Sequence, residues 1–139
     1  MRKRTRSREF ALQILYQIDI TRDIYAASLG SFWQEHSEEA INAEIKEFTS
    51  ELVRGVAENL ETIDKNISNY ATNWDLNRMA VIDRNILRLG SFELMFREDI
   101  PPKVSINEAV ELAKKYSGPE ASKFVNGILD KIKSERKKT

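Results

Sequence analysis

Apolar side chains recur along most of this chain at the spacing of an α-helix. In the first segment they stand three or four residues apart and therefore share one face of a helix predicted over about residues 5–21. The residues of this face are Ala11, Ile14, Leu15 and Ile18. A helix with such a face docks on a core, so the basic residues that lead into it, from Arg2 to Arg8, are expected to be anchored to folded structure.

A second apolar row lies beside this face, displaced by roughly a quarter turn. It consists of Leu12, Tyr16 and Ile20. A helix with two apolar rows either lies between two neighbouring helices or presents one row to a partner. Packing in the core is the simpler of these two interpretations.

The same spacing predicts further helices over about residues 38–60, 61–71, 80–97, 105–116 and 119–134. No segment alternates apolar and polar residues for long, so we predict an all-α fold. The least regular part is residues 22–37, where Leu29-Gly30-Ser31 predicts a break before a short helix anchored by Phe32 and Trp33. Trp74, in a predicted turn, is expected to fill the space between helical layers.

The predicted helix over residues 80–97 is expected to be central, because apolar side chains cover most of its circumference. They are Ile82, Ile86, Leu87, Leu89, Phe92, Leu94, Met95 and Phe96. Glu93 falls among them, and a buried carboxylate needs a partner. Arg97, one turn further on, is the nearest candidate.

Prolines and a capping motif predict the boundaries of the last helices. Pro101 and Pro102 stop the central helix, and Ser105 with Glu108 forms a capping box that predicts the start of the next one. Ser117-Gly118-Pro119 then ends that helix and opens the last, with the proline in the first turn.

Composition excludes several classes of chemistry. The 139 residues have the size of one domain, and 22 basic against 22 acidic side chains give a net charge that indicates no partner. The absence of cysteine excludes disulfides, thiolate metal sites and cysteine nucleophiles, and a lone histidine, His36, excludes a multi-histidine metal site. No apolar run suits a signal peptide or a membrane span, so we expect a cytoplasmic protein, and we predict no metal or cofactor.

Phe124 is a candidate for contact with an unpaired base. It lies at the flank of the apolar stripe of the last predicted helix, with Gly127 and Lys131 on its side. The glycine leaves one ring face open and the lysine places a cation nearby, which suits base stacking. A phenylalanine that merely borders a core explains the same pattern, and both interpretations stand.

The basic N-terminus also has two interpretations. Short basic termini are often solvated tails, whereas arginine binds phosphate through its planar fork of donors. Because these residues run without a linker into a docked helix, contact with the phosphates of an RNA strand is the interpretation we favour.

Three groups of residues resemble the NusB family of transcription antitermination factors. They are residues 8–16 (REFALQILY), residues 83–89 (DRNILRL) with Phe92-Glu93-Leu94, and residues 104–114 (VSINEAVELAK) continued by residues 123–130 (KFVNGILD). The similarity runs in order through nearly the whole chain. Only residues 22–44 lack a matching motif.

This resemblance implies about seven helices in two small helical bundles packed crosswise, within a single domain over residues 1–139 and with sub-bundles of about 1–75 and 76–139. It implies a non-enzymatic RNA-binding protein. The RNA is the single-stranded boxA element in leader RNA of ribosomal operons. The protein partners are the ribosomal small-subunit protein that acts as NusE, and the RNA polymerase elongation complex with other Nus factors.

The resemblance also assigns residues by position. Those expected to contact RNA are Lys3, Arg4, Arg6, Arg8, Tyr70, Arg88, Glu120 and Phe124. Those expected to contact the protein partner are Tyr16, Asp83 and Arg84. Thr5 and Ser7 interrupt the basic segment, where the family often has a denser cluster of cations.

Two other functions remain open at this point. The chain is a helical protein–protein scaffold if its basic segment is incidental. Alternatively, it is an RNA-binding module related to the N-terminal region of ribosomal RNA cytosine methyltransferases, although no Gly-rich nucleotide loop follows a strand and no cysteine is present.

Overall fold

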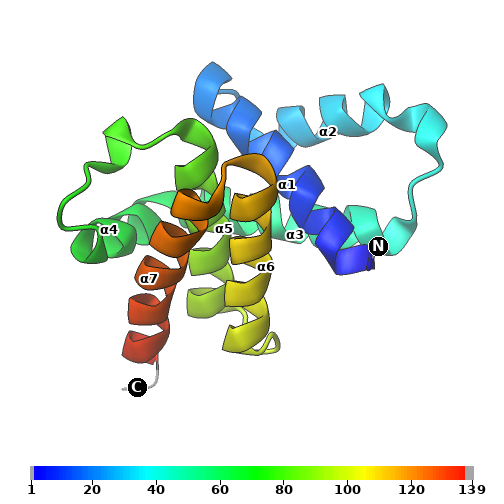
Figure 1. The fold of residues 1–139 in the computed structure, drawn as a ribbon. Helices are drawn as coiled ribbons and strands as arrows, with labels where there is room; N and C mark the ends of the chain where they lie inside the picture. The colour runs from blue at the N-terminus through cyan, green and yellow to red at the C-terminus, as the bar shows by residue number, and fades with distance from the viewer. Residues whose placement is uncertain (1, 137–139) are drawn as a thin grey trace. The chain divides into compact units, whose positions relative to one another are not determined.

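The structure, a computed structural model, describes residues 2–136. Within that range the chain forms seven α-helices and two short 3-10 helices and no strand, so the predicted all-α class is confirmed (Figure 1). The elements are α1 (Lys3–Thr21), α2 (Tyr25–Glu35), η1 (Ser37–Glu39), α3 (Ala43–Glu58), α4 (Leu60–Tyr70), η2 (Leu76–Arg78), α5 (Val81–Phe96), α6 (Pro102–Tyr116) and α7 (Pro119–Arg136). None of the described helices is long and apolar enough to cross a membrane.

The helices group into two compact units, one ending at Glu58 and the other beginning at Asn59. In the first unit, α1 packs against α2 and α3. In the second, α5 packs against α4, α6 and α7. The resemblance implies a sub-bundle boundary near residue 75. In the structure α4 instead belongs to the second unit, where it packs against α5 and α7 and buries Ile63 and Ile67 completely.

Helix α1 buries its predicted apolar face, with Ala11, Ile14 and Leu15 almost inaccessible to solvent. The second row divides. Leu12 is buried, but Tyr16 is 40% exposed and Ile20 57% exposed. Packing of the whole row in the core, the simpler interpretation, is therefore wrong beyond Leu12.

The predicted break at Leu29-Gly30-Ser31 is wrong, because α2 runs through these residues without interruption. Tertiary packing outweighs the low helix propensity of glycine here, since Phe32 is buried with its ring centroid 5.3 Å from that of Phe10. The next helix, α3, begins at Ala43 rather than near residue 38 because η1 and a left-handed residue, Ala40 at φ 45°, come first.

Helix α5 is central to the second unit, as predicted. All ten residues from Asn85 to Leu94 are buried. A Cβ atom at Gly90 would lie only 2.7 Å from Cδ1 of Leu129, so the glycine permits the close approach of α7.

The predicted capping box is wrong. Helix α6 begins at Pro102, where proline suits the first turn, so Ser105 lies inside the helix. Its hydroxyl donates instead to Oε1 of Glu93 at 2.8 Å, and both side chains are buried. Glu93 thus has the hydrogen-bond partner that a buried carboxylate needs. The Arg97 guanidinium donates two hydrogen bonds to the carboxylate of Asp99, with both N···O distances 2.9 Å.

Replacing Ser105 with alanine should lower the free energy of unfolding by about 1–3 kcal/mol, because a buried carboxylate loses a donor. Urea denaturation measures this decrease. Ser134→Ala is the matched control, since Ser134 is an exposed helical serine whose hydroxyl donates to the Asp130 carbonyl. Equal stability of the two variants would contradict the role given to the Ser105 hydroxyl.

Candidate nucleic-acid interface

The basic N-terminal residues form the first turns of α1 rather than a tail. The Lys3 ammonium lies 3.2 Å from a carboxylate oxygen of Glu44 on α3. The guanidinium carbon of Arg4 lies 4.3 Å from the ring centroid of Phe48, within the range of a cation–π contact. Contacts to α3 therefore hold these cations in place.

A small hollow of about 220 Å³ lies between the start of α1 and α3. It is lined by Lys3, Arg4, Ser7, Glu44, Glu47, Phe48 and Glu51. Three carboxylates thus stand beside the two cations, so an RNA phosphate that approaches them competes with acidic side chains for the same donors.

Arg8 differs from the other cations of this segment. It is only 3% exposed, and its guanidinium carbon lies 5.4 Å from the ring centroid of Phe48. Arg6 is half-buried, and its guanidinium carbon lies 4.4 Å from the ring centroid of Phe10. Lys3 and Arg4 are the exposed members of the predicted set.

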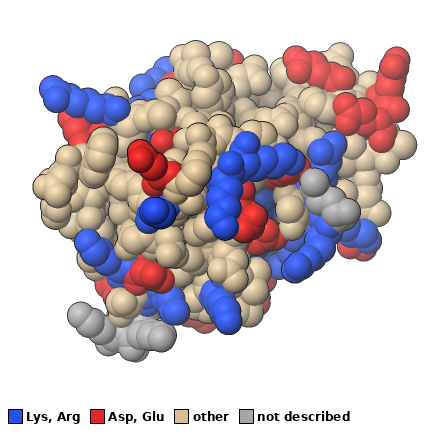
Figure 2. All heavy atoms as spheres, viewed as in Figure 1, with Lys and Arg blue, Asp and Glu red and all other residues tan. Residues whose placement is uncertain are grey.

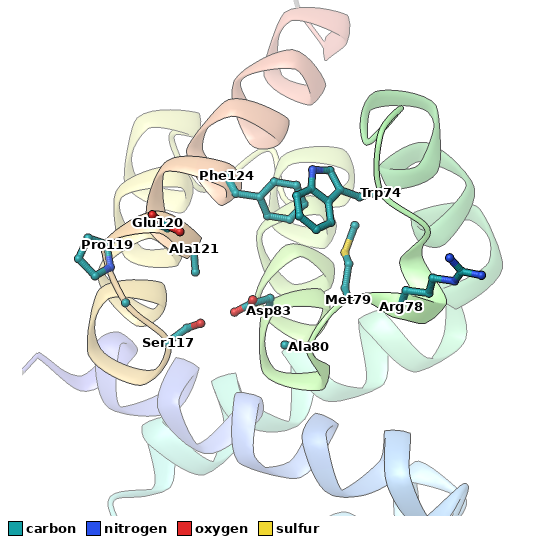
Figure 3. Close-up of a pocket in the computed structure, with 11 residues that line it drawn as sticks. Trp74, Arg78, Met79, Ala80, Asp83, Ser117, Pro119, Glu120, Ala121 and Phe124 are labelled. Carbon is teal, nitrogen blue, oxygen red and sulfur yellow. The ribbon is translucent and has the colours of Figure 1, made fainter.

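A larger hollow, of about 610 Å³, lies in the second unit where the start of α5 faces the α6–α7 turn (Figure 3). Phe124 stands at its rim, and its ring meets that of Trp74 edge to face with centroids 5.4 Å apart. Phe124 is partly exposed, and a Cβ atom at Gly127 would have no neighbour within 4 Å, so the ring is not sealed within a core.

Carboxylates also line this hollow. Asp83 points toward the α6–α7 turn at Ser117, and its Oδ1 is buried without a hydrogen bond from the described residues. Glu120, in the first turn of α7, also lines the hollow. The site therefore combines ring surface with hydrogen-bond acceptors.

Basic side chains also occur on the molecular surface outside these two hollows. Figure 2 shows Lys and Arg side chains interspersed with Asp and Glu over the visible face, so positive charge is not confined to one patch there. This mixture agrees with the balanced net charge of the sequence. The face drawn in Figure 2 therefore presents no extended field of one sign.

Residues 5–134 match a family model described as the NusB family. The Transcription antitermination protein NusB of Anaeromyxobacter sp. (strain Fw109-5) is 49% identical to the chain, over 99% of the chain and 96% of the relative. The chain belongs to the NusB family. Its curated relatives are named for transcription antitermination, a non-enzymatic activity, as expected.

Solved structures of NusB proteins have the same fold. NusB from T. maritima is 38% identical, with a TM-score of 0.84, over 100% of this chain and 98% of that one. Another similar chain, at 30% identity and a TM-score of 0.86 over 97% of this chain and 98% of that one, comes from a crystal structure of antitermination factors NusB and NusE in complex with double-stranded RNA.

Two of the residues that the NusB resemblance assigns to RNA are engaged in contacts inside the second unit. Nε and NH2 of Arg88 bind both carboxylate oxygens of Asp64 at 2.8 and 2.9 Å, and the Arg88 side chain is largely buried. The hydroxyl of Tyr70 donates to Glu135 at 2.8 Å, and this hydrogen bond raises the pKa of Tyr70 above its ordinary value. Neither residue lines the hollow at Phe124.

The three residues that the NusB resemblance assigns to the protein partner lie in different settings. Tyr16 is an exposed ring on α1, in the first unit. Asp83 lines the hollow at Phe124, and the neighbouring Arg84 donates to the backbone carbonyl of Asn77 at 3.3 Å, which ties the η2 turn to α5.

Among the described residues, no group of three His, Asp or Glu side chains suits a metal ion.

The exposure of Trp74 was not predicted from the sequence. The residue was expected between helical layers but is 59% exposed. Its ring contact within the described residues is with Phe124. Its neighbours Asn73 and Asp75 were the available signal, because polar turn residues on both sides favour a surface position.

Replacing Arg88 with alanine should cost about 3 kcal/mol of unfolding free energy, the lower end for a broken buried pair because Asp64 keeps some contact with solvent. Adding Asp64→Asn should restore part of that stability, since no unpaired carboxylate remains. Thermal and urea unfolding of the variants measure both effects.

Arg54→Ala is the control, because Arg54 pairs with Glu58 at the surface and such pairs contribute well under about 1 kcal/mol. An Arg88→Ala variant as stable as Arg54→Ala would mean that the Arg88–Asp64 pair is not structural.

Proposed function

We propose that this NusB-family chain is a transcription antitermination factor that binds the single-stranded boxA-type leader RNA of ribosomal operons together with the ribosomal protein NusE. It acts in the cytoplasm and alters elongation by RNA polymerase with other Nus factors. The observation that carries this proposal is the accessible ring of Phe124 at the rim of a hollow, because specific RNA recognition generally places unpaired bases on aromatic side chains.

The cations at the start of α1 supply the second requirement. A single strand is held by backbone cations together with ring faces for its bases. Lys3 and Arg4 are exposed at the start of α1, where Lys3 pairs with Glu44 and Arg4 packs over the Phe48 ring, and a bound phosphate would take the place of the carboxylate on Lys3. The similar chain crystallised with NusE and RNA supports the same general function.

The exposed row on α1 favours a protein partner as well. Tyr16 and Ile20 are apolar side chains that the first unit leaves in solvent. An adaptor needs both an RNA surface and a protein surface, so the scaffold hypothesis becomes part of this proposal rather than a rival. Asp83 and Arg84 remain proposed partner contacts.

Neutralising Lys3, Arg4 and Arg6 with glutamine should weaken RNA binding and reduce the slope of log K against log salt by about 0.7 for each phosphate that is no longer bound. Arg8 is left in place because it is buried. Fluorescence anisotropy with a boxA-type RNA over a range of salt concentrations measures both quantities, and circular dichroism checks that helical content is kept.

A variant with Arg54, Lys65 and Lys103 changed to glutamine carries the same change in net charge at exposed sites elsewhere. If this control loses as much affinity as the α1 variant, the start of α1 is no specific phosphate site. An affinity that does not depend on salt would contradict the proposal outright.

Phe124→Ala should weaken binding of a boxA-type single strand by about 1–3 kcal/mol, because a stacked base loses its platform. Binding of a duplex of the same sequence should change much less, since its bases are already stacked on one another. Unchanged RNA affinity together with a lower melting temperature would instead make Phe124 a core residue.

A further inference from the structure

Trp74 is an exposed indole whose position the fold itself does not explain. Tryptophan side chains are highly buried on average, yet 59% of Trp74 is accessible. The residue lies in the connection between α4 and η2. Among the described residues, its ring contacts that of Phe124 edge to face. The chain therefore leaves a large apolar surface in solvent beside its proposed RNA-stacking residue.

The indole borders two hollows. One is the hollow of about 610 Å³ that is also lined by Phe124 and Asp83. The other is an open hollow of about 710 Å³ along the connection between α4 and η2, lined in part by Thr72 and Asn73. An exposed aromatic ring that borders open space is the kind of surface on which an unpaired base stacks.

The charges of the first hollow favour a base over a phosphate. Asp83 and Glu120 line it, and the Arg78 side chain points away from the ring pair (Figure 3). Two carboxylates repel a phosphate group.

We propose that Trp74 is a second base-stacking residue: an unpaired nucleobase of the bound RNA enters the hollow and stacks on Trp74 beside Phe124. This inference rests on the proposed RNA-binding function and deepens it. A cationic side chain of a protein partner is the alternative occupant, because ring faces and carboxylates attract cations. Continuity with Phe124 and the two hollows that the indole borders favour the base.

The first test compares Trp74→Ala with the wild-type chain for a boxA-type RNA. The affinity should fall about 5- to 150-fold, the range for the removal of one base stack, and Trp74→Phe should recover part of it by restoring a ring. The matched control is Phe96→Ala, because Phe96 is also exposed and pairs with one other ring, but lies at the opposite end of α5. This control should keep wild-type affinity.

The second test identifies what Trp74 touches. Each nucleotide of the RNA is replaced in turn by an abasic residue, and affinity is measured for the wild-type and Trp74→Ala chains. One abasic position should weaken binding to the wild-type chain and have little further effect on Trp74→Ala, because the two changes remove the same interaction. If every abasic penalty is unchanged in Trp74→Ala, no base stacks on Trp74 and the inference is overturned.

Two further outcomes separate this inference from the function on which it rests. If Trp74→Ala binds RNA normally while the Lys3, Arg4 and Arg6 variant does not, RNA binding stands and the role of Trp74 falls. If Trp74→Ala loses the ribosomal protein partner but not RNA, the hollow receives a protein side chain and the inference falls. A wild-type chain without affinity for any RNA overturns both.

Discussion

Helix α5 must be buried on nearly all sides while it carries charged side chains, and the second unit is arranged to meet both demands. Ten consecutive residues of α5 are buried, among them Arg88 and Glu93. Asp64 of α4 binds the guanidinium of Arg88, and Ser105 of α6 donates to the carboxylate of Glu93. Because an unpartnered buried charge is costly, these two contacts favour the placement of α4 and α6 seen here over other placements on a largely apolar helix.

The periodicity of apolar residues was sufficient to predict the fold class and the central role of α5. It failed where a contact distant in sequence decides the local structure. Ser105 has the sequence of a helix cap, but its hydroxyl binds a carboxylate twelve positions earlier in the chain. Gly30 has the sequence of a break, but the packing of Phe32 on Phe10 keeps α2 continuous. Rules that consider only residues nearby in the sequence take account of neither Glu93 nor Phe10.

The candidate site was predictable to a similar extent. Sequence pattern and resemblance together placed Phe124 at an accessible flank of the last helix, where the structure has it. They did not separate exposed cations from buried ones. Arg8 and Arg88 look like surface arginines until Phe48 and Asp64 are found beside them. Trp74 gives the opposite case, since large apolar residues are expected inside and this one is 59% exposed.

The glutamates of α3 beside the start of α1 act as built-in counterions. Glu44 already neutralises Lys3, and Glu47 and Glu51 line the same hollow. A polyanion therefore meets a surface whose positive potential is partly cancelled, and it must displace carboxylates before its phosphates bind. Such a surface weakens non-specific electrostatic binding of the abundant nucleic acid of a cell. In the proposed function, selectivity for an RNA then depends on contacts other than this charge.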